Sequence, residues 1–416
     1  MCDALSLDRR TFLKAVPGAA ALLAGEFNFR GSAHAQGAPI KIGAPLPLTG
    51  PAAPLGQHSL WGTQAALKLI EAKGGIAGRP VQLIVEDDGG RGADAVRIMR
   101  KMILQDQVDV IIGGASSVDT LPMLPVAKET QTLLLVTVAE SDLITADACN
   151  KYTFRLTPDA RAKARALAPF LTSKVAKKWH FVYWDNAFGQ SMLKWFTAEF
   201  AKAGGEIVVA IPTPAGTPDY SSYLAKLRPP AEVPGLFHSV AGGDAVRLGK
   251  QIGEFGLQKK YKMAGTCDVI FPETFDQQAP DLEGSYIVEQ YLVKDVAPFN
   301  TPADAEFRRA FRDVSKGVWP GPHSYAGYES TFLFKHAVEK AGYRAKADTA
   351  KVIQALEGMS GQKSVEFPQG PFTIRKEDHQ GLLNLYIWQL RNGQAHMEAT
   401  VSPAEAGYPP ATACKM

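Results

Sequence analysis

The residues best suited to hold a small charged ligand lie between positions 108 and 120. Residues 108–112, Val-Asp-Val-Ile-Ile, are mainly apolar and β-branched, as in a buried strand, and Gly-Gly-Ala-Ser-Ser follows at 113–117. A helix that begins there would present free backbone N–H groups and the positive end of its dipole to an anion. Ala115 is too small to block the approach, and the hydroxyls of Ser116 and Ser117 would add donors. The pattern predicts an anion-binding turn, although a glycine turn with a serine N-cap explains it equally well from chemistry alone.

The elements on both sides of this turn repeat in the order of an α/β protein. Short apolar runs alternate with amphipathic stretches, which predicts parallel sheets with right-handed crossovers. A second series starts after Pro158, so we expect two doubly wound, Rossmann-like lobes. Helices at 303–315 and 326–341 are expected to return to the first lobe, and 371–390 to form a hairpin-like pair. The strands expected before them are 40–46, 81–87, 108–114, 132–139, 179–184, 206–211, 235–240 and 261–265, and the helices are 59–72, 93–105, 121–129, 160–171, 188–203, 220–227 and 244–255.

The composition excludes several classes of function. The chain has 416 residues, and its 45 basic and 42 acidic side chains give a formal net charge of +3. There is no basic block with interleaved aromatic residues, so nucleic-acid binding is not expected. No apolar stretch reaches the ~20 residues of a membrane-spanning helix. Neither Cys-x-x-Cys nor His-x-x-x-His occurs, so we expect no metal site and no cofactor.

The N-terminus has the pattern of an export signal. The stretch DRRTFLKAV places Arg9 and Arg10 before the apolar run PGAAALLAG, and small residues at Ala33 and Ala35 suit cleavage by a signal peptidase. The paired arginines resemble a twin-arginine signal. We therefore expect 1–35 to be a signal peptide and the mature protein to be periplasmic.

Three cysteines would remain after that cleavage. They are Cys149, Cys267 and Cys414, and an oxidising compartment would permit one disulfide among them. Cys149 lies in a polar turn and Cys414 in the C-terminal tail, so this pair is favoured.

Over essentially the whole mature chain, the sequence resembles the periplasmic solute-binding proteins of ABC importers, in the branched-chain amino-acid (Leu/Ile/Val) family. The stretches that carry the resemblance are IKIGAPLPLTGPAAPLGQ, AKGGIAGRPVQLIVEDD, DVIIGGASS, PTPAGTPDYSSYLAKLR and AGYESTFLFKHAVEKAG. The resemblance implies the type I periplasmic-binding fold, in which three crossovers join two lobes around the ligand. It places lobe 1 at 36–155 and 291–369 and lobe 2 at 156–290 and 370–416. It also implies a monomer that delivers its small-molecule ligand to an ABC permease.

The same resemblance assigns roles to individual residues. The turn at 113–117 would bind the ligand's α-carboxylate, with Ser117 at the matching hydroxyl position. At the next strand end, Ala139 would offer its main-chain carbonyl and Ser141 its hydroxyl, while Glu140 fits either a ligand contact or a solvated loop residue. Further candidates are Phe188 as a cover over the ligand, Leu55 in the loop after the first strand, and His323 near the hinge.

One position departs from the family pattern. Members that bind amino acids carry a glutamate for the ligand ammonium, and by spacing that position is Cys267 here, followed by Asp268. Either Asp268 pairs with the ammonium, or the ligand is an aromatic or aliphatic carboxylate or an amide. A ligand sensor is a further alternative. An exported enzyme is disfavoured, because Gly-x-Gly-x-x-Gly and Gly-x-Ser-x-Gly are both absent.

Overall fold

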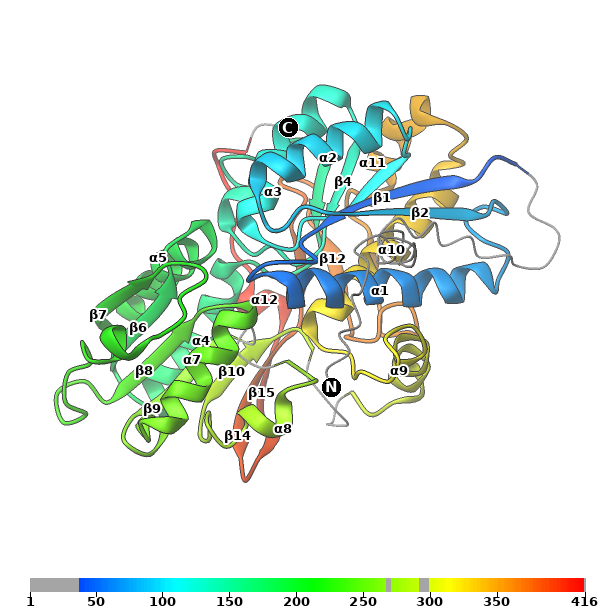
Figure 1. Cartoon of the computed structure of the whole chain (residues 1–416). Coiled ribbons are helices and arrows are strands. Elements are labelled where there is room, and N and C mark those ends of the chain that lie inside the picture. The colour runs from blue at the N-terminus through cyan, green and yellow to red at the C-terminus, as the bar shows by residue number, and fades with distance from the viewer. Residues whose placement is uncertain (1–36, 267–270, 292–298, 415–416) are drawn as a thin grey trace, which may run out of the picture.

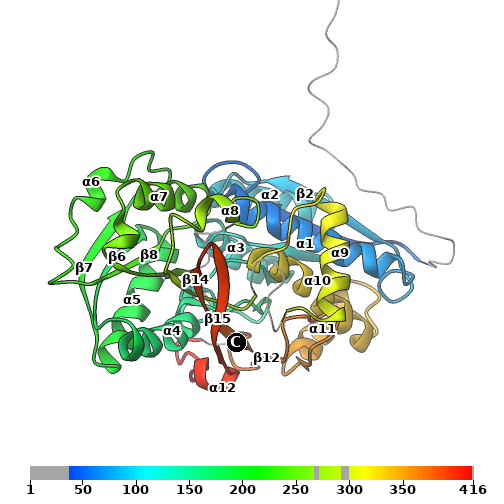
Figure 2. The same cartoon turned by 90° about the horizontal axis from the view of Figure 1, so that it is seen from below.

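The computed structural model describes residues 37–266, 271–291 and 299–414. Its elements form two lobes, which Figures 1 and 2 show side by side. The predicted α/β fold with two doubly wound lobes is confirmed. The signal peptide predicted at 1–35 lies outside the described residues.

Lobe 1 is built on a five-stranded parallel sheet in the order β2-β1-β3-β4-β5. Its strands are short apolar runs that are buried at nearly every position of β1, β3, β4 and β5, as expected when helices cover both faces. The strands are β1 (Ile40–Leu46), β2 (Val81–Asp87), β3 (Val110–Gly113), β4 (Leu133–Val136) and β5 (Thr153–Arg155), and the helices are α1 (Ala53–Glu71), α2 (Gly92–Leu104), α3 (Ser117–Thr130), α9 (Pro302–Val314), α10 (Pro322–Ala341) and α11 (Thr349–Leu356). As predicted, α9 and α10 return to this lobe, where both contact α1.

Lobe 2 is built on a seven-stranded sheet in the order β15-β14-β10-β9-β8-β6-β7. The pairs among β6 to β10 are parallel, and the hairpin of β14 and β15 adds to β10 in antiparallel orientation. The strands are β6 (Lys178–Trp184), β7 (Glu206–Thr213), β8 (Gly235–Ser239), β9 (Lys262–Thr266), β10 (Tyr286–Glu289), β14 (Leu385–Arg391) and β15 (Gln394–Val401), and the helices are α4 (Ala160–Lys174), α5 (Ala187–Lys202), α6 (Ser221–Leu224), α7 (Gly242–Glu254), α8 (Phe275–Gln278) and α12 (Pro403–Ala406).

The C-terminal third differs from the prediction in one respect. The segment expected as a single hairpin-like pair instead divides between two sheets. Its first part pairs as β12 (Phe372–Ile374) with β13 (Gly381–Leu383) and extends to β11 (Ser360–Gly361), whereas β14 joins lobe 2. The exact lobe boundaries remain predictions.

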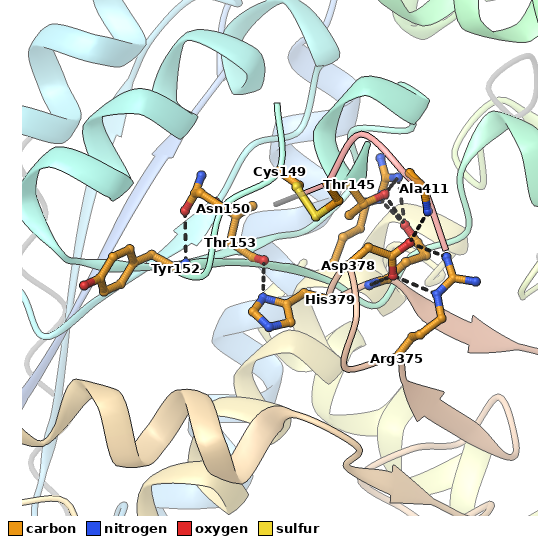
Figure 3. Close-up of a disulfide and its surroundings, with 12 residues drawn as sticks. Thr145, Cys149, Asn150, Tyr152, Thr153, Arg375, Asp378, His379 and Ala411 are labelled. Carbon is orange, nitrogen blue, oxygen red and sulfur yellow. Dashed lines mark hydrogen bonds and ion pairs between the residues drawn. A yellow bond between two sulfur atoms is a disulfide. The ribbon is translucent and has the colours of Figure 1, made fainter. Parts of the chain in front are cut away.

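A disulfide joins Cys149, between the 3-10 helix η1 (Asp142–Thr145) and β5, to Cys414 in the tail (Figure 3). The tail before it is held by polar contacts: Tyr408 donates to the carboxylate of Asp159, at the start of α4, and its carbonyl accepts from Arg375. No described helix is long and apolar enough to cross a membrane.

Candidate functional site

The turn at 113–117 joins the end of β3 to the start of α3. Ser116 has an extended backbone, and its hydroxyl accepts from the N–H of Val118 at 3.3 Å. In return, the carboxylate of Asp119 accepts from the N–H of Ser116, at 3.2 Å to each oxygen. This capping box explains why α3 begins at Ser117, four residues before the helix that periodicity predicted.

Glycine is required at one position of this turn. Gly114 has a φ of +77°, and a Cβ there would lie 2.7 Å from Thr120 Oγ1. The same hydroxyl donates to Asp119 at 2.9 Å. Glycine is therefore required here by the positive φ and by the packing of the Thr120 side chain against the turn.

Two buried carboxyl groups lie behind the turn. Burial, together with the nearby charge of Asp88, raises the pKa of Asp119 well above its usual range. Burial also raises the pKa of Asp88, which follows β2, to about 6. Because a raised pKa makes Asp119 harder to ionise, its side chain opposes an anion at the start of α3 less than an ordinary aspartate would.

The hydroxyl of Ser117 links this turn to the next strand end. Its oxygen accepts from the N–H of Ser141 at 3.1 Å. Among the described residues it donates to none, so its proton can point to a ligand carboxylate. The hydroxyl of Ser141 instead bonds Ser191 Oγ on α5 at 2.9 Å.

A small cavity lies beside the turn, with walls from both lobes. Both lobes contribute to its wall, at the carboxyl ends of their strands, as expected for α/β sheets. It is lined by Leu55, Ala115, Ser116, Ser117, Val138, Ala139, Glu140, Trp184, Phe188 and Ala241.

The wall from lobe 2 is aromatic. Trp184 is the last residue of β6, and its ring lies edge-on to that of Phe188, with centroids 6.4 Å apart. The indole N–H donates to Asp244 at 2.9 Å. Asn186 caps α5 by accepting from the N–H groups of Phe188 and Gly189, which fixes the start of the helix. Both rings are thus held in place before a ligand arrives.

Glu140 belongs to a buried ion cluster. Its carboxylate accepts from the ammonium of Lys163, on α4, at 2.5 Å, and Lys163 also donates to Glu289 at the end of β10. The three side chains are 3%, 0% and 0% exposed in the order Glu140, Lys163, Glu289. Glu140 is therefore not a solvated loop residue, and the alternative that left it in solvent is wrong.

A second buried cation, Arg155, binds the backbone on both sides of Glu140. The guanidinium of Arg155 donates to the carbonyl of Ala139 at 3.0 Å and to that of Ser141 at 2.7 Å. It also bonds the side chain of Gln380 and lies 3.6 Å from Asp159. The carbonyl that the sequence assigned to the ligand thus already accepts from the protein.

Seven of the ten predicted site residues line this cavity, and two of the described ones, Ser141 and His323, do not. Ser141 is buried beside it, with its hydroxyl directed to Ser191. His323 is the second residue of α10 and packs against Phe271, with ring centroids 5.8 Å apart, and it is not among the residues that line the cavity. Asp268 lies outside the described residues. Leu55 lies in the first turn of α1 rather than in a loop, because the helix already starts at Ala53.

Sequence reasoning missed three lining residues and both cations. Val138, Trp184 and Ala241 each stand at or just after a strand end, so the rule that located Ser117 could have found them. Lys163 and Arg155 carry no such signal, since their partners are brought to them by the tertiary fold. In the parts of the chain that the structure describes, no cluster of metal ligands occurs.

Comparisons with known proteins agree with this geometry. A family model described as a periplasmic binding protein matches residues 39–395. The chain is 26% identical, over 92% of its own length and 90% of the relative's, to "Leu/Ile/Val-binding protein homolog 4" of Brucella melitensis.

Among solved structures, a solute-binding protein of an ABC transporter from Rhodopseudomonas palustris, in complex with 3,4-dihydroxybenzoic acid, is similar with a TM-score of 0.78 and 25% identity. That match covers 88% of this chain and 97% of the other. A leucine-binding protein of Thermotoga maritima shares the fold, with a TM-score of 0.74 and 19% identity over 88% of this chain and 99% of the other.

Proposed function

The chain belongs to the periplasmic binding protein family and is a solute-binding protein of an ABC transporter, and from this premise we propose that it captures a small amphiphilic carboxylate and delivers it to a permease. The observation that carries the proposal is the cavity itself. One end of the cavity holds the hydroxyls and the helix N-terminus of the turn at 113–117, and apart from Glu140 the remaining side chains that line it are apolar.

The carboxylate would sit at the start of α3. A charge-assisted hydrogen bond contributes roughly 1.5–3 kcal/mol, so two or three supply much of the ~8 kcal/mol of micromolar binding before ordering costs. The apolar body of the ligand would fill the space between Leu55, Trp184 and Phe188. Because these walls come from both lobes, the ligand favours the closed form, and hinge closure follows from binding.

Two ligand classes fit this description. The Brucella relative carries a branched-chain amino-acid name, and the similar R. palustris protein holds an aromatic acid. Edge-on aromatic rings suit either an aryl or a branched alkyl group. The proposal is therefore a carboxylate with a compact apolar body, of which branched-chain amino acids and benzoate-like acids are the first candidates.

A ligand screen tests the proposal. Ligand that binds only the folded state raises the unfolding midpoint by mass action. Mature protein from Gln36 onward should show a dose-dependent rise with at least one carboxylate among amino, aromatic and aliphatic acids. The corresponding primary amides serve as controls for the carboxylate. No rise with any acid, or an equal rise with the matched amide, would refute the assignment.

The export route is part of the proposal. We expect the pair Arg9-Arg10 to direct transport to the periplasm. Replacing both with lysine should leave full-length precursor in the cytoplasmic fraction, detected by immunoblot, while a change of Lys14 to Arg should not. Normal export of the lysine pair would refute the twin-arginine route.

A further inference from the structure

The cluster of Glu140, Lys163 and Glu289 bears on which carboxylates the cavity accepts. Glu140 is the one charged residue among the ten described residues that line the cavity. A ligand ammonium buried there would need a counter-charge, and Glu140 is the side chain placed to supply it.

That carboxylate already has a cation. The ammonium of Lys163 lies 2.5 Å from Glu140 Oε1 and is also bound by Glu289, so it is held from two sides. All three groups are buried, and the elements that carry them, α4, β10 and the strand end after β4, come from both lobes. A ligand amine at Glu140 would share the carboxylate with Lys163 and face a like charge in a poorly solvated site.

The neighbouring backbone acceptor is engaged as well. The carbonyl of Ala139 accepts from Arg155, which is fully buried and fixed by Gln380. Both acceptors on this wall are thus bound to cations of the protein. The turn at Ser116 and Ser117 offers donors. The cavity therefore has a place for an anion, and each of these two acceptors already binds one cation of the protein.

On the basis of the proposed function, we infer that Lys163 takes the place of a ligand ammonium beside Glu140, so that the site selects carboxylates without an amine. Lys163 acts through Glu140 and is a specificity-determining residue. Its removal should open the cavity wall to an amine.

Matched ligand pairs test this inference directly. Leucine and 4-methylpentanoate differ only in the amine, as do phenylalanine and 3-phenylpropanoate. Titration calorimetry of the wild-type protein should give a dissociation constant at least 10-fold lower for the acid without the amine in the pair that fits the cavity. Tighter binding of the amino acid would overturn the inference, whatever the variants do.

A double variant then tests whether Lys163 causes the preference for carboxylates without an amine. Lys163→Met with Glu289→Gln removes the cation and one carboxylate together, so that Glu140 is the carboxylate left in the cluster. The ratio of the two dissociation constants should shift at least 10-fold toward the amino acid. Adding Glu140→Gln to this variant should reverse the shift. Circular dichroism and the unfolding midpoint establish that each variant is folded.

Different results refute the role of Lys163 and the proposed function. If the wild-type protein binds one of the acids but the ratio stays the same in the folded double variant, the role of Lys163 is refuted and the proposed function stands. If the wild-type protein binds no carboxylate, both are refuted.

Discussion

Replacing Ser117 with alanine should weaken ligand binding by about 10- to 150-fold. The hydroxyl of Ser117 accepts from Ser141 and has its proton available for a ligand carboxylate. A charge-assisted bond of this kind contributes about 1.5–3 kcal/mol, and ~1.4 kcal/mol corresponds to a tenfold change in affinity. The same change leaves the buried N–H of Ser141 without its acceptor, which costs about 1–3 kcal/mol of folding stability.

Calorimetric titration with the best carboxylate of the screen measures the first effect, and denaturant unfolding of the ligand-free protein measures the second. Ser315→Ala is the matched control, because its buried hydroxyl donates to the carbonyl of Val318 at 3.0 Å outside the cavity lining. That variant should lose stability and keep its affinity. An affinity of Ser117→Ala within threefold of wild type would refute the role of the turn as a carboxylate site.

Three more outcomes are expected. Phe188→Ala should lower the affinity for an aryl or branched alkyl carboxylate at least 10-fold by calorimetry, because it removes an apolar wall; an unchanged affinity would place the ligand elsewhere. The free energy of unfolding should rise by about 1 kcal/mol from pH 7 to pH 5 through Asp88. Its folded-state pKa of about 6 lies above the unfolded value, so the folded state binds the proton more tightly and loses this stability as pH rises through 6. Asp88→Asn should remove that part of the pH dependence in denaturant titrations, and an unaltered slope would contradict the assignment. Cys414→Ser should cost about 2–5 kcal/mol of stability, measured against the oxidised wild type; reductant should then have no further effect on the variant, and a further loss would contradict the pairing.

Where local rules apply, the sequence predicted which residues line the cavity. Ser117, Ala139 and Phe188 all follow a strand end, and in α/β sheets such ends converge at the ligand site. Periodicity placed the helix after Ser117 too late, since the first turn of α3 is polar and is set by the capping box rather than by apolar spacing.

Contacts between distant segments were not predictable in this way. The bond from Lys163 to Glu289 joins positions 126 residues apart. A lysine within an amphipathic stretch such as 160–171 is expected to be solvated, and only the packing of α4 against β10 and β14 of lobe 2 buries it. Likewise, the hydroxyl of Ser141 bonds the hydroxyl of Ser191 on α5, and no sequence pattern indicates that these two residues are neighbours.

The disulfide has a consequence for the motion between the lobes. The tail leaves β15 of the lobe 2 sheet and is bonded through Cys414 to Cys149, which precedes β5 of the lobe 1 sheet. It thus forms an additional covalent route between the lobes, and one that a reductant can cut. Since six peptide units separate Tyr408, bonded to Asp159, from Cys414, this route spans at most about 20 Å when stretched. In X-ray scattering, the ligand-free oxidised protein should therefore have a smaller radius of gyration than the reduced protein, and the two should become equal when ligand closes the lobes.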